Sequence, residues 1–463
     1  MVRILASVFM ALLGSGLLQG AILTVGPSGT YPTINQAISA SVVGQDTEIR
    51  VEGGKQYFEN VLIPDSFSSG SIEMTGGWDS TFSVRDTDPS DTTIDGLTAV
   101  RPLEIRITGG TFTLEGFTIK NGVAFGSGGG ILVFPPGNRD VVITLKNTHI
   151  IENYANLGED LNGGGIAAFL SSNEDLIIEN CRIRDNEAES TGGGIVRGGG
   201  LSVFMGHSAY LKVENTEIDG NTLRSGGILY GGGIYLATFD SASADLISTH
   251  VVDNSAIGPR IVASGANLET QGASSLTIER SGFLLNTASG DATPQVETIQ
   301  TDTSVLTVRD SGVGWADDIG MRVSANGSSE AHLVNLTVAD NATTGISLHQ
   351  GDSATLTLYN SIAYGNGSDA AAAGTVAMGF NLLGIDPMFA NSEEFDYRLR
   401  PGSPAEDAGT NTPPGGLGST DFGGNPRIEG GTVDIGMYEG VTYDIFSDGF
   451  ESGVTDAWST TVQ

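Results

Sequence analysis

An eleven-residue phrase recurs along this chain, and it constrains the fold more than any other feature of the sequence. The clearest copies are residues 143–153 (ITLKNTHIIEN), 176–186 (LIIENCRIRDN) and 211–221 (LKVENTEIDGN). Weaker copies begin at Phe112, Ala244, Leu276, Leu306, Ala331 and Leu356. Successive copies start 25 to 35 residues apart. A period of roughly 20–50 residues indicates a solenoid, a propeller or another repeat array.

Each copy of the phrase predicts a β-strand, because apolar residues alternate along it. Ile143 and Leu145 show this alternation in one copy, and Leu211 and Val213 show it in another. The residues between copies lack the helical pattern of roughly 10–15 residues that a strand–helix repeat requires. Leucine-rich and helical repeats are therefore disfavoured.

A series of glycine runs keeps step with the phrase. Gly-Gly-Gly triplets begin at Gly128, Gly163, Gly198 and Gly231, and each is followed by a short apolar strand. Glycine allows the positive φ that a sharp turn needs. One period thus holds a glycine corner, a strand, a polar loop, a second strand and a short third strand ending in Asn. This is one coil of an all-β, single-stranded, right-handed parallel β-helix, stacked at roughly 4.8 Å per coil. A β-propeller is the alternative, although it needs four strands and about 40–45 residues per unit.

Asparagines recur at two positions of the repeat. One column holds Asn147, Asn180 and Asn215, and the other holds Asn153, Asn186, Asn221, Asn254 and Asn286. Asn tolerates the left-handed backbone region, and identical side chains stack when coils stack. We therefore expect hydrogen-bonded amide ladders in both columns.

The ends of the chain differ from the repeats. Residues 1–21 contain one cation, an apolar run and then small residues, which is typical of a signal peptide. Residues 31–40 predict a short N-terminal capping helix, with Pro32 in its first turn. We expect a β-helix domain over residues 22–440, a short C-terminal tail over residues 441–463, and no transmembrane segment in the mature chain.

The charge of the chain limits its partners. There are 55 acidic and 21 basic residues, and the formal net charge is −34. Such a surface repels phosphate backbones, which argues against nucleic-acid binding. It also repels anionic polysaccharides unless calcium bridges the two. The one cysteine, Cys181, excludes an intrachain disulfide and follows a corner Asn, so a buried small side chain is expected rather than a nucleophile.

Several motifs resemble a known group of proteins. The glycine corners followed by Asn-bearing strands are similar to secreted and surface proteins of the bacterial pectin-lyase-like superfamily, especially to polymorphic outer-membrane-protein repeats. Residues 76–82 (GGWDSTF) resemble their early coil. Residues 386–389 (DPMF), 398–405 (RLRPGSPA) and 434–439 (DIGMYE) resemble the closing segment of β-helix proteins called choice-of-anchor Q. The resemblance implies a β-helix exported to the medium or the bacterial cell surface.

The last residues resemble something else. Residues 444–453 (DIFSDGFESG), followed by Trp458, look like a short C-terminal tail found on unrelated secreted bacterial proteins. This resemblance implies a sorting or anchoring tag.

Two constellations of side chains are candidates for chemistry. Position seven of the phrase reads His149, Arg182, Glu217 and His250 over four consecutive coils. If the register holds, these side chains share one outer face, where they could act as acid–base groups or form a solvated ladder of opposite charges. Polygalacturonase-type motifs are inexact and out of order.

The second constellation is an acidic loop formed by Asp86, Asp88, Asp91 and Asp95, which could bind calcium or form a polar turn. No other cofactor is indicated. The sequence therefore favours a non-catalytic binding, adhesion or envelope role, with an extracellular glycan or a host or cell-surface protein as partner. A polysaccharide lyase or glycoside hydrolase is the alternative. The sequence leaves the oligomeric state open.

Overall fold

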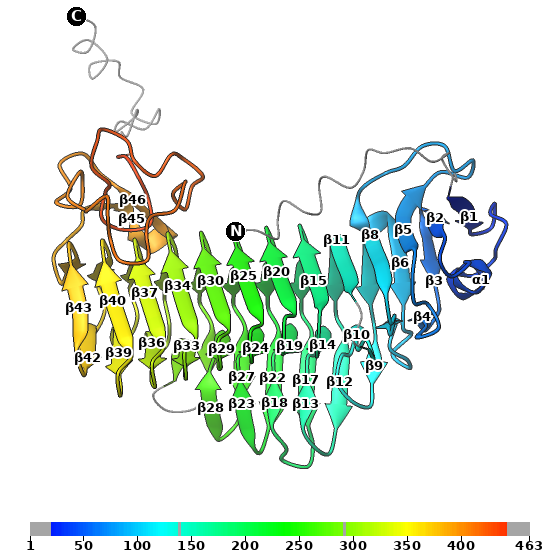
Figure 1. Cartoon of the computed structure of the whole chain (residues 1–463), viewed down its shortest axis with the longest axis horizontal. Helices are drawn as coiled ribbons and strands as arrows, with labels where there is room; N and C mark the ends of the chain where they lie inside the picture. The colour runs from blue at the N-terminus through cyan, green and yellow to red at the C-terminus, as the bar shows by residue number, and fades with distance from the viewer. Residues whose placement is uncertain (1–19, 138–139, 290–292, 442–463) are drawn as a thin grey trace, which may run out of the picture.

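The protein is a right-handed parallel β-helix, described here from a computed structural model that covers residues 20–137, 140–289 and 293–441. Its coils stack side by side along one axis, with one helix at the N-terminal end (Figure 1). The stacking excludes the propeller. No helix in these three ranges is long and apolar enough to cross a membrane. Residues 1–19 and 442–463, which make up most of the expected signal peptide and tail, lie outside the described residues. Ala21, the last residue of the expected signal peptide, is the first residue of the first strand and pairs with Thr47.

The largest sheet, called sheet A, has 23 strands, most coils giving it two. Its strands are β1 Ala21–Val25, β2 Asp46–Glu52, β3 Lys55–Tyr57, β5 Ser71–Trp78, β6 Thr92–Asp95, β8 Gly110–Lys120, β11 Val141–Ile151, β15 Glu174–Glu179, β16 Arg182–Arg184, β20 Tyr210–Glu214, β21 Glu217–Asp219, β25 Ser243–Ile247, β26 His250–Val252, β30 Ser275–Glu279, β31 Gly282–Leu284, β34 Val305–Arg309, β35 Gly312–Gly314, β37 Glu330–Val334, β38 Thr337–Ala339, β40 Thr355–Tyr359, β41 Ile362–Tyr364, β43 Val376–Gly379 and β44 Leu382–Leu383.

Sheet B closes the other side of each coil with 11 strands. They are β4 Val61–Ile63, β7 Leu103–Ile105, β10 Ile131–Val133, β14 Ile166–Leu170, β19 Leu201–Met205, β24 Ile234–Thr238, β29 Ala266–Thr270, β33 Pro294–Gln300, β36 Ile319–Ala325, β39 Thr344–Gln350 and β42 Ser368–Ala373. Between the sheets lies the core, where Ile143, Leu176, Leu211 and Leu276 are buried in one column with Ala244. The predicted column is confirmed.

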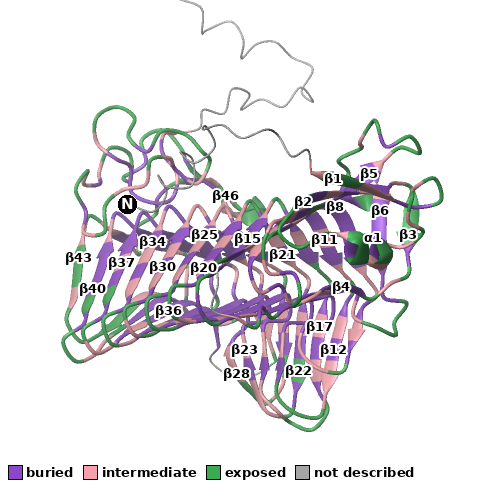
Figure 2. Cartoon of the chain, turned by 45° about the vertical axis from the view of Figure 1, so that its right-hand side comes forward, coloured by how far each residue is buried: buried purple, intermediate pink, exposed green. Residues whose placement is uncertain are grey.

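The middle coils carry a lobe that the repeat pattern did not predict. Two small sheets form it, and they project away from the coils (Figures 1 and 2). Sheet C contains β9 Val123–Ala124, β12 Tyr154–Leu157, β17 Glu187–Ser190, β22 Thr222–Ser225, β27 Ser255–Ile257 and β32 Thr287–Ala288, and sheet D contains β13 Leu161–Asn162, β18 Val196–Arg197, β23 Ile228–Tyr230 and β28 Arg260–Ala263. The later coils, whose phrases are 25 residues apart, have no strand in either sheet within the described ranges. The longer period therefore accommodates the lobe.

The glycine corners connect the lobe to sheet B. Gly198 joins β18 to β19 with φ +63°, and a Cβ there would lie 2.2 Å from the carbonyl oxygen of Leu201. Any other residue would have to move the backbone or accept a strained left-handed conformation. The corner thus sets the close approach of sheet D to sheet B.

The amide ladder is confirmed in one asparagine column and not in the other. Each Nδ2 of the buried column donates to the next Oδ1 at 2.9 Å, through Asn153, Asn186, Asn221, Asn254 and Asn286. The corner column adopts positive φ instead. In the described ranges its side chains make no such ladder, because they lie outside the coil at the turn. The prediction of a ladder in that column was wrong.

The two ends of the solenoid are finished differently. Helix α1, Ile34–Ala40, covers the first coil, with Thr33 as its N-cap and Ile34, Ala37 and Ile38 buried. A short 3₁₀ turn, Pro89–Asp91, lies in the loop over β8, and a second follows at Ser392–Glu394.

The coils stop at Leu383, well inside the expected β-helix domain of residues 22–440. Residues 385–441, the closing segment, then fold back over the outer face of sheet A and include the hairpin of β45 Phe389–Asn391 and β46 Asp396–Leu399 (Figure 1). Arg427 fixes this segment, because its buried guanidinium lies 3.5 Å from both Asp310 of the coils and Glu439.

Candidate functional site

The four side chains predicted to share a face do lie next to one another. His149 is the register partner of Arg182, Arg182 of Glu217, and Glu217 of His250. Arg182 is held by two carboxylates, 3.3 Å from Glu217 and 3.1 Å from Asp219. Its charge is therefore satisfied by neighbouring coils, as in a stacked ladder of opposite charges.

The surroundings of the two histidines at the ends of this stripe lower their pKa values. Burial lowers the pKa of His149, and the charge of Arg182 lowers it further, against the opposing effect of Asp88. Burial also lowers the pKa of His250, whose ring packs edgewise on Phe422 of the closing segment at 5.7 Å between centroids. The geometry fits an ion-paired face, and the acid–base role of these groups stays a prediction.

The four acidic residues proposed for calcium do not assemble. Asp88 caps the 3₁₀ turn by accepting from the amide of Ser90, and Asp95 accepts from Leu97 and from the side chain of Asn121. The described ranges contain no group of three or more acidic, His or Cys side chains placed to hold a metal ion. The oxygens of Asp88 and Asp95 are thus used in local turns.

A row of aromatic rings runs along the outer face of sheet B. Phe134, Phe169, Phe204 and Tyr235 follow one another with centroids 6.1, 5.8 and 5.1 Å apart. Tyr230 of sheet D adds a fifth ring, 5.9 Å from Tyr235. Phe134 is 43% exposed, while Phe169 and Phe204 are half-buried. Phe134, Phe169 and Phe204 therefore present ring edges to solvent over three consecutive coils, whereas Tyr235 is buried at the end of the row.

A hollow opens beside this row. Its volume is about 350 Å³, and Phe169, Phe204, Leu170, Met205 and Phe239 line its apolar part. His207 and Asp240 form a polar rim, with His207 Nδ1 3.5 Å from the Asp240 carboxylate. A mostly apolar hollow with a few polar groups is the usual chemistry of a binding site.

Arg197 of sheet D links the aromatic row to a polar cluster. Its guanidinium carbon lies 5.6 Å from the ring centroids of Phe204, Tyr230 and Tyr235, a cation–π geometry. Burial raises the pKa of Glu269, and the charge of Arg197 opposes the shift. On this side of the cluster, Arg197 of sheet D and Glu269 of sheet B therefore meet near the glycine corner.

The other side of the cluster lies on the next two coils. Burial raises the pKa of Glu297 from 4.5 to about 7, although its ion pair with Arg322, at 2.9 Å, opposes the shift. Asn267, the register partner of Glu297, is fully buried, and neither atom of its amide is hydrogen-bonded. A buried amide without partners is costly, and perturbed carboxylates gather preferentially at functional sites.

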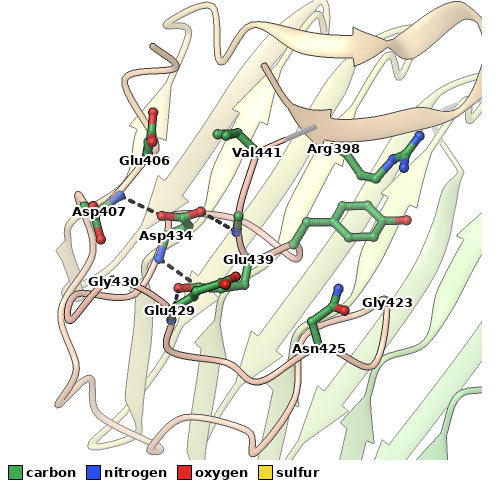
Figure 3. Close-up of a pocket in the computed structure, with 12 residues that line it drawn as sticks. Arg398, Glu406, Asp407, Gly423, Asn425, Glu429, Gly430, Asp434, Glu439 and Val441 are labelled. Carbon is green, nitrogen blue, oxygen red and sulfur yellow. Dashed lines mark hydrogen bonds between the residues drawn. The ribbon is translucent and has the colours of Figure 1, made fainter. Parts of the chain in front are cut away.

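A larger cavity, of about 620 Å³, lies in the closing segment (Figure 3). Its acids point at backbone groups of the segment itself. Asp434 accepts from the amides of Asp407 and Gly440, and Glu439 accepts from Glu429 and Asp434. Burial raises the pKa of Glu439 to about 7. These carboxylates hold the loop together by accepting from its backbone amides.

A comparison with protein families agrees with the fold. A model described as the right-handed beta helix region matches residues 201–382. Among solved structures, a pectin methylesterase from Aspergillus niger is similar at 13% identity, covering 81% of this chain and 94% of that chain, with a TM-score of 0.30. None of the curated proteins matches this chain. The likeness to the esterase is too distant to inform activity.

The sequence contains a signal for the aromatic row, although the repeat pattern described above did not predict it. The fourth residue after the glycine triplet is phenylalanine in three consecutive coils, at Phe134, Phe169 and Phe204. This position follows an alternating strand and faces outward. Arg197 and Tyr230 carry no such signal, because the lobe brings them to sheet B from another part of the repeat. Glu269 and Glu297 carry none because they occupy non-equivalent positions of adjacent strands.

Proposed function

We propose that this protein is an exported binding protein that holds a neutral glycan chain along the outer face of sheet B. The observation that carries the proposal is the continuous row of rings from Phe134 to Tyr235, with a hollow on one side and a buried polar cluster at its end. Export to the medium or a bacterial cell surface is supported by the signal-like residues 1–21. The resemblance to choice-of-anchor Q proteins is consistent with it.

The chemistry of the face fits a glycan. Exposed aromatic rings and apolar side chains contact the carbon-bound hydrogens of sugar rings, while amides, carboxylates and guanidinium groups bond their hydroxyls. Glu269 is half-buried and lies on the same face of β29 as Asn267, whose own amide is fully buried, and the charge of Arg197 acts on Glu269. The row runs across the coils, so a chain-like ligand can contact several coils at once.

The charge of the protein selects against other polymers. A formal net charge of −34 repels polyuronates, sulfated glycans and nucleic acids. The described residues hold no acidic cluster that could recruit a metal ion as a bridge. A neutral glycan is therefore the class of polymer that this surface can bind without electrostatic repulsion.

Calorimetric titration with neutral gluco-, xylo- and manno-oligosaccharides tests the proposal. Replacing Phe169 and Phe204 together by Ala should weaken binding about 5- to 150-fold, because each ring contact contributes roughly 0.5–1.5 kcal/mol. Phe125→Ala is the matched control, since that ring is 84% exposed and lies outside the row. Arg182→Ala tests the opposite face. Binding that survives the double substitution but fails in Arg182→Ala would move the site to sheet A.

Glycan hydrolysis is the second candidate, favoured by one observation. Glu269 and Glu297 lie on adjacent coils two residues out of register, which places their Cα atoms roughly 8 Å apart from strand spacing and rise. Paired carboxyls at ~5–9.5 Å act as acid and base or nucleophile in glycosidases, and the pKa of Glu297 suits an acid. Release of reducing ends from the same oligosaccharides, abolished in Glu297→Gln, would favour hydrolysis over binding alone.

A further inference from the structure

The last coil of the solenoid ends in free strand edges. β42 is the final strand of sheet B and pairs only with β39, while β43 and β44 pair only with β40 and β41. Within the described ranges no strand lies on their other side. Each edge therefore presents backbone amides and carbonyls that a further strand could use.

No segment within the described ranges caps this end, in contrast to the beginning of the solenoid. At the first coil, α1 buries three apolar side chains over β1 and β4. At the last coil, the closing segment turns away and packs on the side of the coils, as the contacts Trp315–Phe395 and His250–Phe422 show. Figure 1 shows this segment beside the coils, and Figure 2 shows exposed residues along β43.

The chemistry of the end coil favours pairing rather than protection. Residues 368–383 (SDAAAAGTVAMGFNLL) hold a single charged residue, Asp369, in a chain of net charge −34. Proteins usually protect a free edge with charges, proline or a bulge. Here β42 ends in four small alanines, and Phe380 nearby is 55% exposed.

We infer that two copies of this chain associate tail to tail through their last coils, with β42 of one copy antiparallel to β42 of the other about a two-fold axis. A second copy fits for three reasons. Asp369 is the one charged residue among residues 368–383 of the end face, so highly charged partners gain little there. The acidic sides of two copies repel, which leaves this end as the surface where they can meet. The α1 cap blocks head-to-tail stacking, so the pair closes and does not grow into a filament.

The contact is small and should be concentration-dependent. One coil supplies fewer residues than the roughly 20–30 per side of a standard interface. Main-chain bonds between the two β42 strands give the pairing its register, and the alanines allow close approach.

Sedimentation of the full chain from about 1 to 100 µM tests the inference. The mass should rise from that of one chain, 47.8 kDa, toward twice that value. Ala371→Glu and Ala371→Lys should each stay at the mass of one chain, because like charges then face each other at the pairing edge. An equimolar mixture of the two variants should restore the doubled mass, which a misfolded variant could not do. Val84→Glu, with the same added charge in an exposed loop far from this end, should still double.

Two results would overturn the inference. One is a doubled mass that persists in Ala371→Glu. The other is a single-chain mass for the natural sequence at every concentration. In that case, hydrogen exchange at residues 368–373 identifies the occupant. Protected amides would mean that another part of the same chain covers the edge, and unprotected amides would mean that it is open to a foreign segment.

Discussion

The buried amide ladder should be the most sensitive element of the solenoid to a single polar substitution. Asn221 illustrates why. Its Nδ2 donates to the carbonyl of Ile183 and to Oδ1 of Asn254, both at 2.9 Å. Its Oδ1 accepts from the backbone amide and from Nδ2 of Asn186, at 3.0 and 2.9 Å. Asn221→Ala removes all four bonds and leaves their partners buried without replacements.

The expected cost follows from these contacts. At about 1 kcal/mol for each lost hydrogen bond, Asn221→Ala should reduce the free energy of unfolding by about 4 kcal/mol. Asn180→Ala is the matched control, because Asn180 lies at a corner with φ +53° and has no place in the ladder. Its cost should be about 1 kcal/mol, the strain of a left-handed alanine. Asn180→Gly should recover that loss, whereas Asn221→Gly should not recover its own.

Urea unfolding followed by circular dichroism measures the difference between the two sites. Hydrogen exchange gives a local reading, because the amide of Asn186 loses its acceptor in Asn221→Ala and should exchange faster. Equal losses of stability in Asn221→Ala and Asn180→Ala would refute the ladder as the source of the stability.

Further predictions concern buried and titrating groups. The thiol of Cys181 is buried with its pKa raised to about 12, so a thiol reagent should label it only after unfolding. Arg427→Ala should cost roughly 3–5 kcal/mol and expose the closing segment to proteases, because two buried carboxylates lose their partner. The raised pKa of Glu297 means that its contribution to stability is present below about pH 4.5 and lost as pH rises through about 7. Thermal melts of Glu297→Gln should therefore vary less than wild type over that window. Polygalacturonate should not be turned over, with or without calcium, in an ultraviolet lyase assay.

The period of the repeat determined much of the fold. Alternating apolar residues place Leu176 and Leu211 in one buried column, and the pairing of equivalent strands carries that register from coil to coil. The same arithmetic placed His149 beside Arg182 and Arg182 beside Glu217. These features depend on interactions between equivalent positions, which a repeat makes visible in the sequence.

The tertiary structure decided what the period does not encode. The lobe brings Arg197 against rings of sheet B, and the closing segment lies on the side of the coils because Arg427 meets Asp310 there. It also decided which asparagine column forms the ladder, since only side chains that point inward at Asn153 and Asn221 can reach the next coil. Such contacts join non-equivalent positions of the repeat. Their geometry depends on the direction in which the lobe and the closing segment leave the stacked coils. Packing sets that direction, and local sequence does not.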